Sequence, residues 1–146
     1  MKKDSKHLHL GRIGELLAKA KFIEYDFDVY STEVDHQGID FIIKNKKGEY
    51  FEIQVKATNG NYVFMRKEIF NPKNNLFLML LAYKDDQPNY ILIPSMEWKD
   101  NLQSFMTDKN YDGKKSAPEY GIYTSDKYLE KIKETYSFKK IVNRLK

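Results

Sequence analysis

The chain has 146 residues, of which 41% are hydrophobic and 14% aromatic, a composition typical of a folded domain rather than of a disordered segment. It contains no cysteine, which excludes disulfide bonds, thiolate metal ligands and thiol nucleophiles. The longest apolar run, at 76–83, has the length of a strand and is too short for a membrane span. The charged N-terminal segment lacks the apolar core of a signal peptide. We therefore expect one cytoplasmic domain over residues 1–146.

The net charge of +4 is unevenly distributed along the chain. Residues 44–75 and 125–146 each carry seven basic side chains against three acidic ones, whereas residues 13–43 carry seven acids against Lys19 and Lys21. Basic segments suit the phosphates of a nucleic acid, and an acidic patch suits a metal ion bound by oxygen atoms. Chance clustering on a solvated surface accounts for the same pattern. On charge alone, that plainer interpretation is favoured.

Hydrophobic periodicity predicts one helix followed by several strands. The helix is expected from Gly11 to about Tyr25, because apolar residues recur there at helical spacing: Ile13, Leu16, Leu17, Ala20 and Ile23. Gly14 and Gly11 near its start would allow a close approach to another backbone. Strands are predicted at 27–33, 38–45, 49–58 and 76–83. The last of these is apolar on both faces, as expected of a central strand.

The second half of the chain mixes strands, loops and helices. Residues 62–70 begin as a short strand and then turn helical, and a strand at 90–93 leads to a helix capped by Ser95. The polar segment 103–119 is predicted to form an exposed loop. A strand at 120–124 precedes a last helix, with Ser125 as its N-cap. The element order predicts a mixed α/β fold with a sheet of about five strands.

The strand pair within residues 38–57 has a register that its apolar residues determine. Each strand is apolar on one face, with Ile39, Phe41 and Ile43 on the first and Phe51, Ile53 and Val55 on the second. Both sets have to face the core, because a slip of one residue would turn one set to water. A three-residue turn at 46–48 satisfies this requirement by pairing Asn45 with Glu49. It also places Gly48 where such a turn needs a left-handed residue.

The same register gathers polar side chains on the opposite face of the strand pair. Asp40 is expected to face Gln54, and directly opposed residues have Cβ atoms about 4.5–5.5 Å apart. Lys56 follows two residues further along this face. Glu52 lies on it too, opposite Ile42 and nearer the turn. Strand pairing alone therefore predicts a cluster of oxygen ligands beside an ammonium group.

The chain resembles the PD-(D/E)XK nuclease superfamily in an ordered set of short motifs. They are "GRIGE" with Glu15 in the first helix, "GID" with Asp40 at a strand start, and "QVK" with Gln54 and Lys56 on the next strand. The pattern covers residues 11–58 and is most similar to the branch in which glutamine replaces the second carboxylate. The resemblance implies a restriction-endonuclease-like fold, with a mixed sheet flanked by α-helices. Two departures are that no proline precedes Asp40, and that Gln54 removes a negative charge that Glu15 or Glu52 would have to restore.

The resemblance also implies a site for a divalent cation, Mg²⁺ or Mn²⁺. Asp40 would be its main ligand, Gln54 a side-chain oxygen ligand or a positioning residue, and the carbonyl of Val55 a third ligand. Glu15 would act through a metal-bound water or as a direct ligand. Lys56 would orient the attacking water or stabilise developing charge. A bound metal ion neutralises phosphoryl charge and lowers the pKa of its water, as phosphodiester hydrolysis requires.

Each of these residues also has a purely structural interpretation. Glu15 precedes Lys19 by four residues and fits a weak surface pair, which for Glu15 alone is the favoured interpretation. Asp40 and Lys56 fit a cross-strand salt bridge at the sheet rim. Gln54 fits a hydrogen-bond network without metal.

The histidines and the large aromatic residues give weaker signals. His7 and His9 lie in the basic N-terminal segment, and no role is predicted for them. His36 is a minor candidate for an additional acid or a phosphate contact. Trp98 and the tyrosines are interpreted as core or interface residues rather than as platforms for stacking nucleobases.

The leading hypothesis is a metal-dependent endonuclease that acts on DNA, with the basic segments contacting phosphates. The alternative is a nuclease-like domain with little or no catalysis, acting as a nucleic-acid-binding or protein-interaction module. Gln54 favours this alternative, whereas the presence of Glu15, Asp40 and Lys56 favours the enzyme. A small-molecule or tRNA-modifying enzyme is a third class, but the sequence has no glycine-rich phosphate loop to support it. A homodimer is left open.

Overall fold

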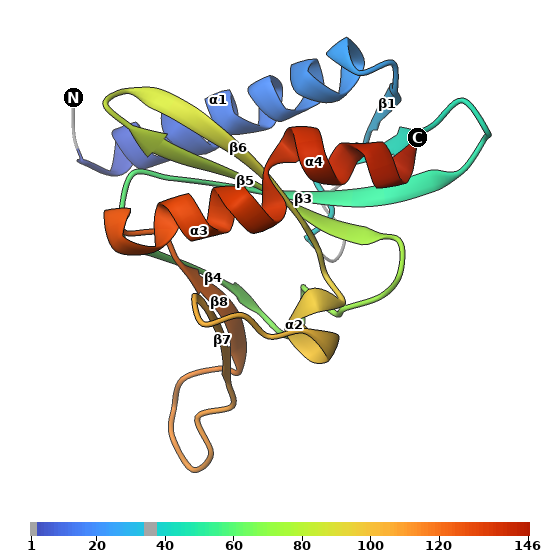
Figure 1. Ribbon diagram of the computed structural model, residues 1–146. Coiled ribbons are helices and arrows are strands. Elements are labelled where there is room, and N and C mark those ends of the chain that lie inside the picture. Colours follow the sequence, from blue (N-terminus) through green and yellow to red (C-terminus); the bar gives the residue numbers. More distant parts are fainter. Residues whose placement is uncertain (1–2, 34–37) are drawn as a thin grey trace.

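The computed structural model describes residues 3–33 and 38–146 and contains two β-sheets with helices around them (Figure 1). The helices are α1 (Lys3–Glu24), α2 (Glu97–Asp100), α3 (Asp126–Tyr136) and α4 (Phe138–Val142), followed by a 3-10 turn at Asn143–Leu145. The strands are β1 (Asp28–Ser31), β2 (Phe41–Lys44), β3 (Tyr50–Thr58), β4 (Tyr62–Arg66), β5 (Leu76–Lys84), β6 (Gln87–Pro94), β7 (Met106–Lys109) and β8 (Glu119–Tyr123). No helix in the described ranges is long and apolar enough to cross a membrane.

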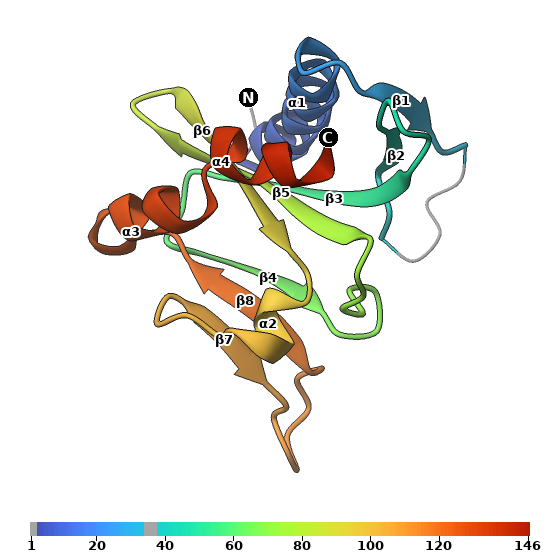
Figure 2. The same cartoon turned by 45° about the vertical axis from the view of Figure 1, so that its right-hand side comes forward.

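The large sheet has five strands in the order β1-β2-β3-β5-β6. β3 and β5 are parallel, and the other neighbours are antiparallel. α1 and α4 cover one face of this sheet, and the small sheet lies against the other (Figure 2). β5 is buried from Leu76 to Ala82, because both faces of a central strand are covered. The predicted mixed α/β fold, with a sheet of five strands flanked by helices, is confirmed.

The small sheet has the order β4-β8-β7 and was not foreseen from the sequence. The segment 103–119, predicted to be a loop, contains β7, whose Met106 pairs with Ile122 of β8. The prediction was wrong for residues 106–109, because three of the four residues of β7 are polar and the strand forms by pairing with a partner further along the chain. Trp98 lies against this sheet, 2% exposed, and its Nε1 donates to the carbonyl oxygen of Gly121 at 3.0 Å. Its interpretation as a core residue is therefore confirmed.

The predicted register of the β2–β3 hairpin is confirmed. Phe41 pairs with Ile53, and Ile43 pairs with Phe51. The backbone N–H of Asn45 donates to the carbonyl oxygen of Glu49 at 3.0 Å, which closes the three-residue turn. Gly48 has φ +88°, the left-handed conformation that this turn requires.

Most of the apolar residues whose spacing predicted α1 are not on its buried face. Ile13, Leu16 and Ile23 are 50%, 63% and 59% exposed, while Ala18 and Phe22 are fully buried. The buried face combines small residues with Phe22, whose ring packs edge-on against Phe41 and Phe138. At Gly14 the helix approaches β3 closely, because a Cβ atom there would lie only 2.8 Å from Cβ of Ala57. Gly11 makes no such approach. The helix also begins earlier than predicted, at Lys3.

Ser95 and Ser125, the two predicted N-caps, do not make the expected capping hydrogen bonds. The hydroxyl of Ser95 donates to the carbonyl oxygen of Lys73 at 2.8 Å and accepts from its N–H at 3.0 Å, and Met96 is the N-cap of the short α2. Ser95 therefore ties two chain segments together rather than capping a helix. Ser125 is the N-cap of α3, as predicted, but its side chain makes no capping hydrogen bond.

Candidate active site

Asp40 directly precedes β2 and lies beside the middle of β3. Its N–H donates to the carbonyl oxygen of Ile53 at 2.9 Å, and its Oδ2 accepts a hydrogen bond from the N–H of Val55 at 2.6 Å. The carboxylate thus takes the place that a backbone carbonyl would hold if the ladder continued. In an antiparallel strand, the N–H and C=O of one residue point toward the same neighbour. The carbonyl of Val55 therefore opens onto the same strand edge as the Asp40 carboxylate.

Gln54 is the buried member of the predicted cluster, with 4% of its surface exposed. Its Oε1 has no hydrogen-bond partner among the residues that the structure describes. Gly38 covers it: a Cβ atom at this position would lie 3.4 Å from both Oε1 and Nε2 of Gln54 and 2.9 Å from the carbonyl oxygen of Ile69. The glycine of "GID" is thus required both by its φ of +74° and by space. A buried acceptor with no donor is costly unless a donor or a cation reaches it.

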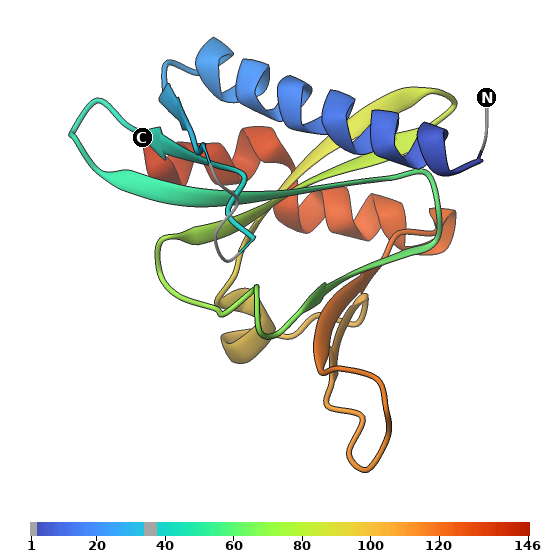
Figure 3. The ribbon, with the colours of Figure 1, turned by 180° about the vertical axis from the view of Figure 1, so that it is seen from behind.

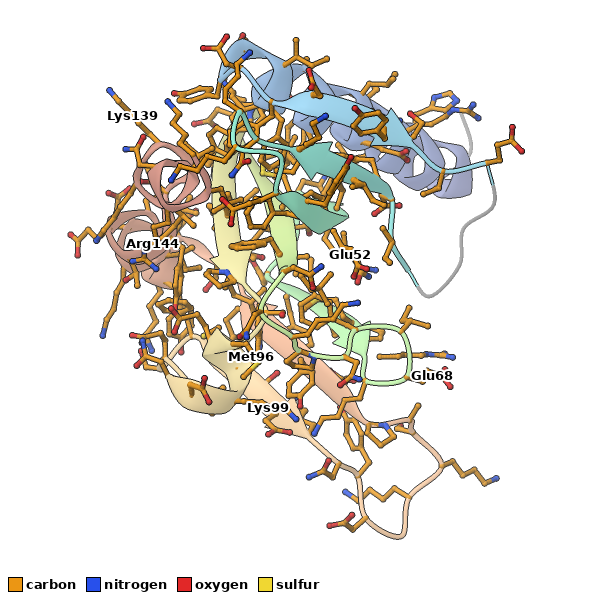
Figure 4. The ribbon with its side chains drawn as sticks, turned by 90° about the vertical axis from the view of Figure 1, so that its right-hand side faces the viewer. Glu52, Glu68, Met96, Lys99, Lys139 and Arg144 are labelled. Atoms are coloured by element: carbon orange, nitrogen blue, oxygen red, sulfur yellow. The ribbon has the colours of Figure 1, made fainter. Side chains whose placement is uncertain are left out.

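Two hollows open on either side of Gln54 along β3. One, of about 330 Å³, is lined by Lys56, Tyr62, Val63, Phe64, Arg66 and Ile69. The other, of about 230 Å³, is lined by Ile39, Glu52, Glu68, Ile69, Asn71, Lys73 and Leu76. Figure 4 looks toward the second hollow, with Glu52 projecting from the large sheet and Glu68 from the segment after β4. Ile69 lines both hollows and so separates them.

The two glutamates considered as additional ligands have lysine partners. Glu52 Oε2 lies 2.6 Å from Nζ of Lys73, and Glu15 Oε1 lies 3.3 Å from Nζ of Lys19. The structure therefore contains the surface pair between Glu15 and Lys19 that the structural interpretation of Glu15 expects. Lys19 also donates to Ser31 Oγ at 3.1 Å on β1, which pairs with the start of β2. Glu15 thus lies near the strand end that carries Asp40, with its carboxylate occupied by Lys19.

The structure therefore brings the Asp40 carboxylate against the backbone of Val55, the residue that follows Gln54, and places Lys56 in the adjacent hollow. The described residues contain no group of three or more His, Cys, Asp or Glu side chains that could hold a metal ion. A cation here would instead take one carboxylate, one amide oxygen and one backbone carbonyl, a set of hard oxygen donors that suits Mg²⁺. His36 lies outside the described residues, and His9 is exposed.

Sequence reasoning missed two features of this region. Lys73 neutralises Glu52 from the loop before β5, and nothing in the local sequence marks this contact. The steric function of Gly38 was also missed, although its place in the "GID" motif was a usable signal. Both features depend on loops that approach β3 from distant parts of the chain.

No protein-family model and no curated protein matches this sequence. The structure is similar to that of a bacterial homing endonuclease, I-Ssp6803I, with a TM-score of 0.52 and 13% sequence identity. The match covers 91% of this chain and 89% of the endonuclease chain. At this identity the likeness concerns the fold alone. The chain therefore has a mixed α/β fold of the restriction-endonuclease-like type.

Proposed function

We propose that residues 1–146 form a divalent-metal-dependent endonuclease that hydrolyses phosphodiester bonds in DNA. The observation that carries the proposal is the buried Oε1 of Gln54, which lacks a donor among the described residues and lies beside the Asp40–Val55 junction. A cation would stabilise an acceptor in this position. The atoms proposed to bind this cation are all oxygen atoms. The nuclease-like fold supports the same assignment.

In this proposal Asp40, Gln54 and the carbonyl of Val55 hold Mg²⁺ or Mn²⁺. The ion, when bound, would neutralise charge on the phosphoryl oxygens and lower the pKa of a bound water. The N–H of Val55 fixes the orientation of the Asp40 carboxylate through its 2.6 Å hydrogen bond. Burial under Gly38 restricts Gln54 to one position. The protein thus presents the oxygen ligands in a fixed arrangement before a substrate arrives.

Lys56 has the position of a group that acts on the phosphate. It is on the same strand face as Gln54, opens into the hollow of about 330 Å³, and makes no ion pair with the described carboxylates. Its ammonium can donate hydrogen bonds to the attacking water and to a non-bridging phosphoryl oxygen, where negative charge develops. Glu15 is proposed to act near Asp40 as a metal ligand, either directly or through a water. This role requires its carboxylate to release Lys19.

A second function is a nucleic-acid-binding or protein-interaction module with little catalysis. It is favoured by the replacement of a carboxylate with Gln54, and by the pairing of Glu15 and Glu52 with lysines. In this alternative the basic segments would bind phosphates, but the ligand set would be too weakly charged to hold a cation.

The proposal is tested by incubating the protein with supercoiled, linear and branched DNA in Mg²⁺ or Mn²⁺, with EDTA as a control. Asp40→Ala and Lys56→Ala are each expected to abolish cleavage. Matched controls are Asp28→Ala and Lys44→Ala, which remove the same side chains from the far ends of β1 and β2, where the two residues pair. These controls should cleave like the wild type. Unchanged nicking by either site variant would refute the site, and binding without cleavage by the wild type would favour the second function.

A further inference from the structure

Four aromatic rings form a row across the outer face of the small sheet. Phe64 and Tyr62 on β4 stack with centroids 6.4 Å apart and an interplanar angle of 23°. Tyr62 lies 5.1 Å from Tyr123 on β8, which stacks on Tyr128 of α3 at 5.6 Å and 26°. This aromatic row, Phe64–Tyr62–Tyr123–Tyr128, starts at the hollow that contains Lys56. Figure 3 shows β4 continuing from β3 into the small sheet.

Tyr62, the second ring of the aromatic row, is fixed by hydrogen bonds. The hydroxyl of Tyr62 donates to Oε2 of Glu119 at 2.5 Å and lies 2.8 Å from Oγ1 of Thr107. Gly121 makes room for it, since a Cβ atom there would lie 2.1 Å from the Tyr62 hydroxyl oxygen. A ring held in one orientation provides a flat surface at little cost in conformational entropy.

The aromatic row is accessible, in contrast to the aromatic residues of the core. Phe64 is 46% exposed, and Tyr62, Tyr123 and Tyr128 are half-buried. Trp98, by comparison, is 2% exposed. Cross-strand aromatic pairs stabilise sheets without any ligand, so the rings alone do not identify a binding surface.

Cations line the aromatic row along its length. Nζ of Lys109 lies 4.8 Å from the ring centroid of Tyr62, and Nζ of Lys127 lies 5.3 Å from that of Tyr128. Lys56 is at the other end, in the hollow beside Phe64. These three lysines form no ion pair within the described part of the chain, and the nearby Glu119 accepts hydrogen bonds from Tyr62 and Tyr111. The surface therefore combines stacking faces with three lysines that form no ion pair among the described residues, beside the Glu119 carboxylate that lies opposite Lys109 in the sheet.

We propose that the aromatic row binds a single-stranded segment of nucleic acid that leads to Lys56. Unpaired bases would stack on the exposed rings, and the lysines would contact the phosphates between them. This combination binds single strands with little sequence preference, because every base has a stacking face. A paired duplex keeps its bases stacked on each other and cannot use the rings. Only the identification of Lys56 as the cleavage end rests on the proposed function.

The test measures binding of a fluorescent single-stranded oligonucleotide and of the matching duplex, in EDTA to prevent cleavage. Phe64→Ala is expected to weaken single-strand binding about 5- to 100-fold and duplex binding less than about 2-fold. The matched control is Tyr50→Ala, because Tyr50 is 56% exposed, contacts Tyr30 at 6.3 Å and has Lys44 5.8 Å from its ring, but lies at the far end of β3. This control is expected to bind both DNAs like the wild type.

A second variant gives a direct signal of contact. Phe64→Trp should keep single-strand affinity, and its exposed indole should be quenched by the oligonucleotide, whereas the buried Trp98 contributes a constant background. Equal losses for Phe64→Ala and Tyr50→Ala, equal losses for both DNAs, or absence of quenching would overturn the inference. The assay measures binding in EDTA, where no cleavage occurs. Failure of the proposed function therefore leaves this test unaffected.

Discussion

The backbone N–H of Val55 donates a 2.6 Å hydrogen bond to Oδ2 of Asp40, so a side chain completes the backbone ladder between β2 and β3. Asp40 therefore contributes to the structure as well as to the candidate site. A variant that removes its carboxylate altogether would remove both contributions at once. The two can be separated, because an amide oxygen accepts the same hydrogen bond without the negative charge.

Asp40→Asn is expected to abolish metal-dependent cleavage while leaving the fold stable. The free energy of unfolding should fall by less than about 1 kcal/mol, because Val55 keeps an acceptor. Asp40→Ala leaves that N–H without its acceptor and should cost about 1–3 kcal/mol. Nicking of supercoiled DNA and denaturant unfolding measure the two effects. An Asn variant that cleaves at the wild-type rate would show that the charge of Asp40 is not needed.

Gln54→Glu is expected to make the stability of the protein depend on metal. In EDTA the new carboxylate is buried near Asp40 without a counter-charge, which should lower the free energy of unfolding by about 2 kcal/mol or more. Mg²⁺ or Mn²⁺ should restore much of this loss, because a cation that binds only the folded state stabilises it. Melting temperatures with EDTA and with metal test this. The exposed Gln87 supplies the control Gln87→Glu, for which metal should change nothing; a metal-independent Tm for Gln54→Glu would argue against a cation site.

Gly38→Ala is expected to be more damaging than Gly48→Ala, although both residues have a left-handed backbone. Gly48 has φ +88° and no atom within 4 Å of an added Cβ, so its substitution should cost about 1 kcal/mol through the backbone alone. At Gly38 a Cβ atom also meets the carbonyl oxygen of Ile69 at 2.9 Å. The additional loss should be at least about 1 kcal/mol, and cleavage should fall as Gln54 is displaced. Equal unfolding energies for the two variants would contradict the close packing over Gln54.

The parts of the fold that the sequence predicted are those set by strong, local apolar patterns. Only one register of the β2–β3 hairpin keeps Phe41 and Ile53 inside, and the structure has that register. The face of α1 could not be read in the same way. Its buried side is marked by Gly14, Ala18 and Phe22, of which the first two are small and give little hydrophobic signal, so that Phe22 alone indicated this face. The exposed Ile13 belongs to the stripe that periodicity alone selected.

The same distinction between local patterns and long-range contacts applies to the candidate site. The approach of Asp40 to β3, where it contacts the backbone of Ile53 and Val55, follows from hairpin pairing, which is a local property of the sequence. The ion pair of Glu52 with Lys73, the wall formed by Ile69 and the aromatic row depend on contacts between distant segments. No sequence pattern specifies such contacts. The catalytic roles of Glu15 and the other site residues stay predictions.

The free energy of unfolding is expected to fall as the pH rises above 10, and Tyr62 should contribute to that fall. Burial, and then the hydrogen bond to Glu119, raise the pKa of Tyr62 above its ordinary value of 10.0. Above this pH the unfolded chain loses a proton that the folded chain keeps, so the unfolded state gains in stability. Tyr62→Phe should therefore unfold with a shallower dependence on pH in this range, as measured by urea unfolding at a series of alkaline pH values. Identical slopes for the variant and the wild type would contradict this.

Gly14→Ala and Gly11→Ala should have opposite effects, although both replace glycine in the same helix. Gly11 has no atom within 4 Å of an added Cβ, so alanine there should stabilise the protein by about 0.5–1 kcal/mol through helix propensity. At Gly14 the added Cβ lies 2.8 Å from Cβ of Ala57, and two backbone-anchored atoms can separate only if α1 moves away from β3. This should cost about 1–3 kcal/mol and displace the adjacent Glu15. Combining Gly14→Ala with Ala57→Gly should recover part of the loss in a double-mutant cycle of unfolding energies. If both single variants were stabilised equally, α1 would not approach β3 through Gly14.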